Sequence, residues 1–162
     1  MPAYRELAAL HRRGKGDAEA AIAVYRSALD VMPEQPVLLD ELGQSLVLAG
    51  RPSDAIEVYD RLIELQPKND TAANNFAALV ADHAYDDEAM LERALEVAER
   101  FRGSDNGLFL DTLGWLYYRD GQYPAASTYL GRAVAAGPDR PDLRYHLGMA
   151  LERTGDTEGA LE

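Results

Sequence analysis

The chain has 162 residues, of which 47% are hydrophobic and 27% are charged, so it can bury the core of one globular domain or of a short repeat array. Its formal net charge of −12 comes without the basic stripe that nucleic acids require, and anionic membrane surfaces would repel it. The absence of cysteine excludes disulfides, thiolate metal sites and cysteine nucleophiles, and no apolar run approaches the ~18 residues that span a bilayer.

The chain repeats itself. Three segments that each run from a glycine to a proline align with one another: residues 16–33, 50–67 and 121–138. Upstream of these, a Leu-Gly pair is followed at a constant distance by a second glycine, in Gly43–Gly50, Gly114–Gly121 and Gly148–Gly155. Apolar residues recur at three- and four-residue spacing within both kinds of segment, which predicts pairs of amphipathic helices.

The glycines and prolines have distinct expected roles in these pairs. Gly50 and Gly121 are predicted to terminate the first helix of a pair in the left-handed conformation. Gly43 and Gly114 fall inside helices, where glycine costs roughly 1 kcal/mol relative to alanine, so we expect another helix to approach closely there. The prolines are predicted to stop the second helix before the next pair begins.

This pattern resembles the tetratricopeptide repeat (TPR), a helix pair of about 34 residues. Leu42, Gly43, Ala55, Tyr59 and Pro67 match its motif in one repeat, and corresponding residues match in the others. The resemblance implies an all-α fold, a right-handed TPR superhelix with four full repeats and one partial repeat in a single domain over residues 1–162. The expected repeats span about 2–35, 36–69, 70–106, 107–140 and 141–162.

Two of these repeats depart from the pattern. The third fits only with an insertion of about five residues, so we expect a longer hairpin loop near Tyr85–Glu88, a tolerated insertion rather than a partner contact. The fifth stops partway through its second helix without a polar cap. We therefore expect the sequence to be a piece of a longer protein, or its last residues to fray.

Enzyme chemistry finds little support in the sequence. The histidines, His11, His83 and His146, form no metal-ligand pair on one helix, and no glycine-rich phosphate loop is present. Asp111 and Thr112 beside His146 could form a proton-transfer cluster, but no candidate nucleophile joins them. We expect no catalysis, no cofactor and no metal site.

The resemblance also implies which residues bind a partner, because ligands of TPR proteins contact the first helices of successive pairs. The residues at the corresponding positions are Asp40, Glu41, Gln44, Asn74, Asn75, Asp111, Trp115, Tyr118, Tyr145 and Met149. Trp115, Tyr118, Tyr145 and Met149 are expected to form an aromatic patch facing the groove, with packing of these residues on the neighbouring repeat's first helix as the alternative. Asn74 and Asn75 suit the backbone of an extended peptide. The acidic residues disfavour recognition of a C-terminal carboxylate, which requires cationic donors.

The expected function is non-catalytic protein–protein interaction, with a partner peptide or helix in the concave groove. One alternative is a self-assembling scaffold or homo-oligomer formed through uncapped repeat ends. Another is a docking or regulatory domain of a larger protein, because residues 109–156 are also similar to TPR segments of bacterial envelope and exopolysaccharide-export proteins. The acidic charge favours plain solubility, with attraction of a basic partner as the alternative interpretation.

The compartment is not decided by the sequence. Only Lys15 and Lys68 are lysines among the 16 basic residues, a bias typical of GC-rich bacterial genomes. Charged residues near the start interrupt the apolar run that a signal peptide requires, so we expect no targeting segment in this chain. Bacterial cytoplasm and periplasm both remain open.

Overall fold

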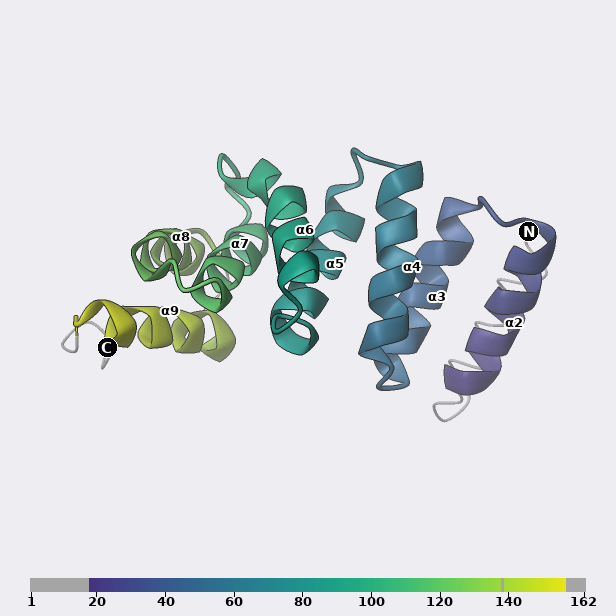
Figure 1. Ribbon diagram of the computed structural model, residues 1–162, viewed down its shortest axis with the longest axis horizontal. Helices are drawn as coiled ribbons and strands as arrows, with labels where there is room; N and C mark the ends of the chain where they lie inside the picture. Colours follow the sequence, from purple (N-terminus) through teal and green to yellow (C-terminus); the bar gives the residue numbers. More distant parts are fainter. Residues whose placement is uncertain (1–17, 138, 157–162) are drawn as a thin grey trace. The chain divides into compact units, whose positions relative to one another are not determined.

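The computed structural model describes residues 18–137 and 139–156; the predictions for the first helix of the first repeat and the second helix of the fifth fall outside them. The described residues form eight α-helices, one 3₁₀ turn and no strand, which confirms the predicted all-α fold class (Figure 1). Two compact units divide the chain, unit 1 over Met1–Phe76 and unit 2 over Ala77–Glu162, and each is described by itself.

Unit 1 contains α2 (Ala18–Val31), α3 (Pro36–Leu48), α4 (Pro52–Leu65) and the first half of α5 (Asp70–His83). Helix α3 contacts both α2 and α4, so these three helices share a core. Tyr25 and Leu42 are buried in that core, and Ala55, Ile56 and Tyr59 of α4 are buried at the three- and four-residue spacing of an amphipathic helix. The helices begin where the sequence favours it, because α3 and α4 each carry proline in the first turn.

Unit 2 contains the rest of α5, then α6 (Glu88–Ala98), a 3₁₀ turn (Glu99–Phe101), α7 (Gly107–Arg119), α8 (Tyr123–Ala136) and α9 (Pro141–Thr154). Helix α8 contacts α7 and α9, and α6 contacts α7. Leu113 and Leu116 of α7, Leu130 of α8 and Leu143 of α9 are buried. We call the helices that open a hairpin (α3, α5, α7 and α9) the first helices, and the others the second helices.

The glycines behave as predicted. Gly50 and Gly121 follow first helices with φ of 70° and 77°, a left-handed conformation that side chains other than glycine's rarely adopt. A Cβ atom added at Gly43 would lie 2.7 Å from the Tyr59 ring, and one added at Gly114 would lie 2.7 Å from the Leu130 side chain. The first and second helices therefore approach too closely at these points for any larger residue.

The hairpin loop of the third repeat is longer than its neighbours, but not by the expected five residues. It spans Ala84–Asp87, which is one residue more than the loops over 49–51 and 120–122, so it does not hold an insertion of about five residues. The Asp87 side chain accepts from the Met90 amide at the start of α6, and a 3₁₀ turn extends the chain after α6.

Candidate functional site

The ten predicted partner-binding residues divide between the two units. Unit 1 holds five of them: Asp40, Glu41, Gln44, Asn74 and Asn75. Unit 2 holds the other five: Asp111, Trp115, Tyr118, Tyr145 and Met149. Each group lies on first helices, and each is described within its own unit.

The solvent-facing side of α3 has an unusual composition. An α-helix turns about 100° per residue, which brings six residues within one arc of about 120°: Val37, Asp40, Glu41, Gln44, Val47 and Leu48. We call these six residues the α3 stripe; the opposite side of the helix is buried. The exposed fractions of its apolar members are 43% for Val37, 45% for Val47 and 71% for Leu48. Because the outer side of a surface helix is normally polar, the stripe exposes more apolar surface than solubility requires.

The centre of the α3 stripe is acidic. Gln44 Nε2 donates to Asp40 Oδ2 at 2.8 Å, and the Tyr25 hydroxyl donates to Glu41 Oε2 at 3.0 Å. Burial and then the negative charge of Glu41 raise the pKa of Asp40, while the hydrogen bond from Gln44 lowers it. Helix α3 itself contains no lysine, arginine or histidine.

The two asparagines of α5 occupy different environments. Asn75 hydrogen-bonds the buried Tyr59; burial and then the charge of Asp40 raise the pKa of Tyr59 to about 12, against the effect of that hydrogen bond. The Oδ1 atom of Asn74 is buried and has no hydrogen-bond partner, an arrangement that costs about 1–3 kcal/mol. Asn74 is therefore the predicted peptide-holding residue with an unused acceptor.

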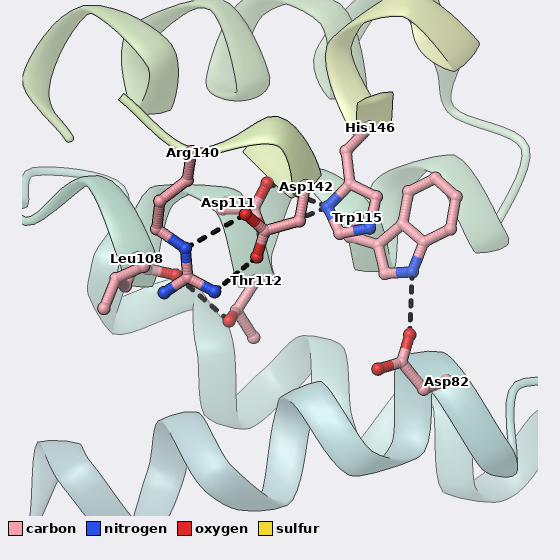
Figure 2. Close-up of polar contacts among 8 residues, drawn as sticks. All are labelled: Asp82, Leu108, Asp111, Thr112, Trp115, Arg140, Asp142 and His146. Carbon is pink, nitrogen blue, oxygen red and sulfur yellow. Dashed lines mark hydrogen bonds and ion pairs between the residues drawn. The ribbon is translucent and has the colours of Figure 1, made fainter. Parts of the chain in front are cut away.

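Trp115 is the centre of the group in unit 2 (Figure 2). Its indole Nε1–H donates to Asp82 Oδ1 of α5 at 3.1 Å. Its ring stacks on the His146 ring of α9 with centroids 4.1 Å apart, and on the Tyr118 ring with centroids 4.6 Å apart. The Arg119 guanidinium lies 4.5 Å from the Trp115 ring centroid, in the position of a cation–π contact. One side chain thus connects three first helices.

The expectation that Trp115 faces an open groove is not met. Only 6% of Trp115 is exposed, because His146, Tyr118 and Arg119 surround its ring. The packing alternative therefore describes its environment. Arg119 is fixed in turn, since its Nε donates to the Ala81 carbonyl at 2.8 Å and its guanidinium lies 3.9 Å from the Tyr85 ring centroid.

Asp111 and His146 form a close pair between α7 and α9 (Figure 2). His146 Nδ1 lies 2.9 Å and 3.1 Å from the two carboxylate oxygens of Asp111. A carboxylate can only accept, so Nδ1 carries the proton. The hydroxyl of Thr112 donates to the Leu108 carbonyl at 3.1 Å rather than to His146, so it does not complete a nucleophile–histidine–aspartate arrangement. The pair acts here as a connection between helices.

Tyr145 offers the largest aromatic surface to solvent in this group. It is 61% exposed, and its ring centroid lies 6.0 Å from that of His146. Tyr118 and Met149 are partly buried, and Tyr118 meets Tyr123 edge to face with centroids 5.5 Å apart. The rings of Tyr118, Trp115 and His146 therefore form a stacked row, and the exposed Tyr145 ring lies tilted beside its His146 end.

Three residues outside the ten hold Trp115. Asp82, Arg119 and His146 all contact the Trp115 ring or its Nε1–H. The resemblance to the repeat also implies groove positions for these three residues, but it did not predict that they contact Trp115.

The described helices form pairs of similar length that are joined by short turns. Within each unit the helices pack on their neighbours in sequence. This arrangement is an α-solenoid of helical hairpins. Two family profiles described as tetratricopeptide repeat match the sequence, one over residues 13–81 and the other over residues 112–162. The chain belongs to the tetratricopeptide repeat family, whose members generally mediate protein–protein interactions and are typically non-catalytic.

Several solved structures share the fold of the chain at low sequence identity. MamA from Desulfovibrio magneticus RS-1 (residues 41 to the end) is 22% identical with a TM-score of 0.83, over 99% of this chain and 88% of MamA. TTC0263 from Thermus thermophilus is 24% identical with a TM-score of 0.65, over 99% of this chain and 84% of that protein. YrrB, described as a TPR protein with an unusual peptide-binding site, is 16% identical with a TM-score of 0.74, over 98% of this chain and 79% of YrrB. No curated protein matches the chain in sequence.

Two kinds of feature are absent from the described part of the chain. None of its helices has the length and apolar character needed to cross a membrane. Over the same residues, no group of three or more histidine, aspartate or glutamate side chains is arranged to hold a metal ion.

Proposed function

We propose that this chain is a non-catalytic interaction module that binds a segment of a partner protein on the exposed side of its first helices. The observation that carries the proposal is the distribution of exposed large apolar side chains. Among the described residues of α-helices, the exposed large apolar side chains on first helices belong to Val37, Val47, Leu48, Leu108 and Tyr145. On second helices they are only Val31 and Leu65, each the last residue of its helix.

Such a distribution has a physical meaning. Scattered exposed apolar residues are normal on any surface, whereas concentration on one type of helix marks an interaction surface. Tyr145 is well placed as an anchor, because it is exposed while the stacked rings of His146 and Trp115 fix the surface beside it. A fixed surface loses little side-chain entropy on binding, which favours affinity. The peptide-binding site described for YrrB, which shares the fold, supports a peptide as the ligand class.

A peptide-display selection tests the proposal. The wild-type chain is compared with a Leu108→Ser/Tyr145→Ser variant, which removes two exposed apolar side chains from first helices. A Val31→Ser/Leu65→Ser variant removes two from second helices and is the matched control. All three are first shown to be equally folded by circular dichroism.

The proposal predicts one consistent motif for the wild type and the control, and its loss from the first-helix variant. Equal loss in both variants, or retention of the motif in both, contradicts it. Analytical ultracentrifugation at increasing protein concentration distinguishes partner binding from the alternative of a self-assembling scaffold, because it measures the mass of the assembly. A mass that rises with concentration in the wild type and falls back in the Leu108→Ser/Tyr145→Ser variant would assign the same surface to self-association.

A further inference from the structure

We infer that Asp82 and Arg119 bind a main-chain amide group of the partner segment, which lies across them in an extended conformation rather than as a helix. This inference rests on the proposed function and adds the conformation of the partner. Asp82, Arg119 and the residues that hold them all belong to unit 2.

The side chain of Arg119 is held in place while most of its hydrogen-bond donors remain unused. Its guanidinium lies 3.9 Å from the Tyr85 ring centroid and 4.5 Å from the Trp115 ring centroid, and its Nε donates to the Ala81 carbonyl at 2.8 Å. The two terminal nitrogens make no hydrogen bond within the described part of the chain, and both remain accessible to solvent. Arg119 therefore presents fixed N–H donors to a ligand.

Asp82 places a hydrogen-bond acceptor beside these donors (Figure 2). Its Oδ1 accepts from the Trp115 indole at 3.1 Å, and the carboxylate of this exposed residue makes no other hydrogen bond to the described residues. Asp82 and Arg119 form no ion pair with each other, although Arg119 is bonded to the carbonyl of Ala81, the residue before Asp82. We call Asp82 and Arg119 the polar pair.

An amide is the chemical group that satisfies both members of the polar pair. Its C=O can accept from the Arg119 guanidinium, its N–H can donate to the Asp82 carboxylate, and it carries no charge. A carboxylate or a phosphate would match Arg119 alone and would be repelled by Asp82. An ammonium group would match Asp82 alone and would be repelled by Arg119.

The main chain of an extended segment is the source of amides that we infer. Inside an α-helix the main-chain N–H and C=O groups are bonded to one another, so they are not available to a second protein. An extended segment keeps one free donor and one free acceptor at every residue that is not proline. A side-chain amide would instead require asparagine or glutamine at one position of the partner.

The polar pair also lies on a path from the exposed aromatic anchor of the proposed function. Tyr145 is 61% exposed and Tyr85 is 41% exposed. They are the two ends of a row of contacts that passes through His146, Trp115 and Arg119. The row crosses from α9 through α7 to the loop after α5, so a segment anchored at Tyr145 can follow it across the polar pair.

N-methylation of the main chain of a bound peptide tests the inference. The probe is a peptide obtained from the display selection, made in versions that each carry one N-methyl group. Each version loses one main-chain N–H and keeps all its side chains. Fluorescence anisotropy measures the dissociation constants with the wild-type chain, with Asp82→Asn and with Asp120→Asn. Asp120 is the matched control, because its exposed carboxylate accepts from Gln122 rather than from Trp115.

The expected results connect one peptide amide with the polar pair. Asp82→Asn should weaken the unmodified peptide about fivefold or more, and Asp120→Asn less than about twofold. One N-methyl version should bind Asp82→Asn and the wild type equally, because the bond that Asp82 accepts is already lost from that peptide. Arg119→Lys keeps the charge but not the guanidinium fork, and should weaken the unmodified peptide about fivefold or more. The N-methyl group alters only the peptide, so misfolding of the protein does not explain such coupling.

Several results would overturn the inference. These are the absence of any N-methyl version that loses its sensitivity to Asp82→Asn, coupling of Asp82 to an asparagine or glutamine side chain instead, and a helical bound peptide in transferred nuclear Overhauser spectra. A selected motif that depends on Leu108 and Tyr145 but tolerates Asp82→Asn and Arg119→Lys would overturn the inference and keep the proposed function. Failure to select any motif would overturn both.

Discussion

Trp115 is predicted to be a structural connection rather than a ligand contact, and replacing it with phenylalanine measures that role. The substitution removes the Nε1–H bond to Asp82, worth about 0.5–1.5 kcal/mol, and weakens the cation–π contact with Arg119, worth about 0.5–1 kcal/mol. A phenyl ring keeps part of the stacking on His146 and Tyr118. We therefore expect Trp115→Phe to lower the free energy of unfolding by about 2 kcal/mol, and Trp115→Ala by about 3–5 kcal/mol.

The assay is urea unfolding followed by far-ultraviolet circular dichroism. The urea concentrations at the unfolding midpoint are compared for variants that share the same m-value, the slope of unfolding free energy against urea concentration. Tyr145→Ala is the control, because that aromatic side chain is 61% exposed and its removal should change the unfolding free energy by less than about 0.5 kcal/mol. The reasoning is refuted if Trp115→Phe unfolds within about 0.5 kcal/mol of the wild type, or if Tyr145→Ala is as destabilising as Trp115→Ala.

Three further predictions follow from the contacts. Gly114→Ala should lower the unfolding free energy by about 1–3 kcal/mol in urea unfolding, because its Cβ would lie 2.7 Å from Leu130; an increase would contradict the close approach. The raised pKa of Tyr59, about 12, should appear in a spectrophotometric titration as a late tyrosine that Tyr59→Phe removes. Since Tyr59 favours its protonated form when folded, this contribution to stability is present below about pH 10 and is lost as pH rises through about 12. Asp40→Asn should raise the unfolding free energy at neutral pH, because the raised pKa of Asp40 means that folding penalises its charged form; thermal unfolding that shows a loss would contradict this.

Much of the fold could be predicted from the sequence because its determinants are local. Gly50 and Gly121 mark turns through a conformation that only glycine adopts readily, and Gly43 and Gly114 mark close contacts between helices. The length of the third hairpin loop was not predictable in the same way. Alignment to the repeat placed all the extra residues at one point, whereas the structure has one extra residue in the 84–87 loop and a 3₁₀ turn after α6.

The exposure of the candidate site residues could not be predicted from the repeat pattern. A motif position indicates which side of a helix Trp115 occupies, and the favoured prediction was that this side faces the groove; the Trp115 ring instead stacks on His146 of the next first helix, as the packing alternative had it. It does not tell whether a neighbouring side chain covers the ring, because that depends on the identity and rotamer of His146 and Arg119. Exposure of Tyr145 and burial of Trp115 therefore required the three-dimensional structure.

The central claim is that partners bind on the first helices, and mapping of amide chemical shifts tests it most directly. A peptide obtained from the display selection is added to isotopically labelled chain, and the perturbed amides are assigned. The account predicts that the largest shifts fall in the first helices α7 and α9 of unit 2, around Leu108 and Tyr145. Shifts confined to α4 and α8 would place the ligand on the second helices and would contradict the account.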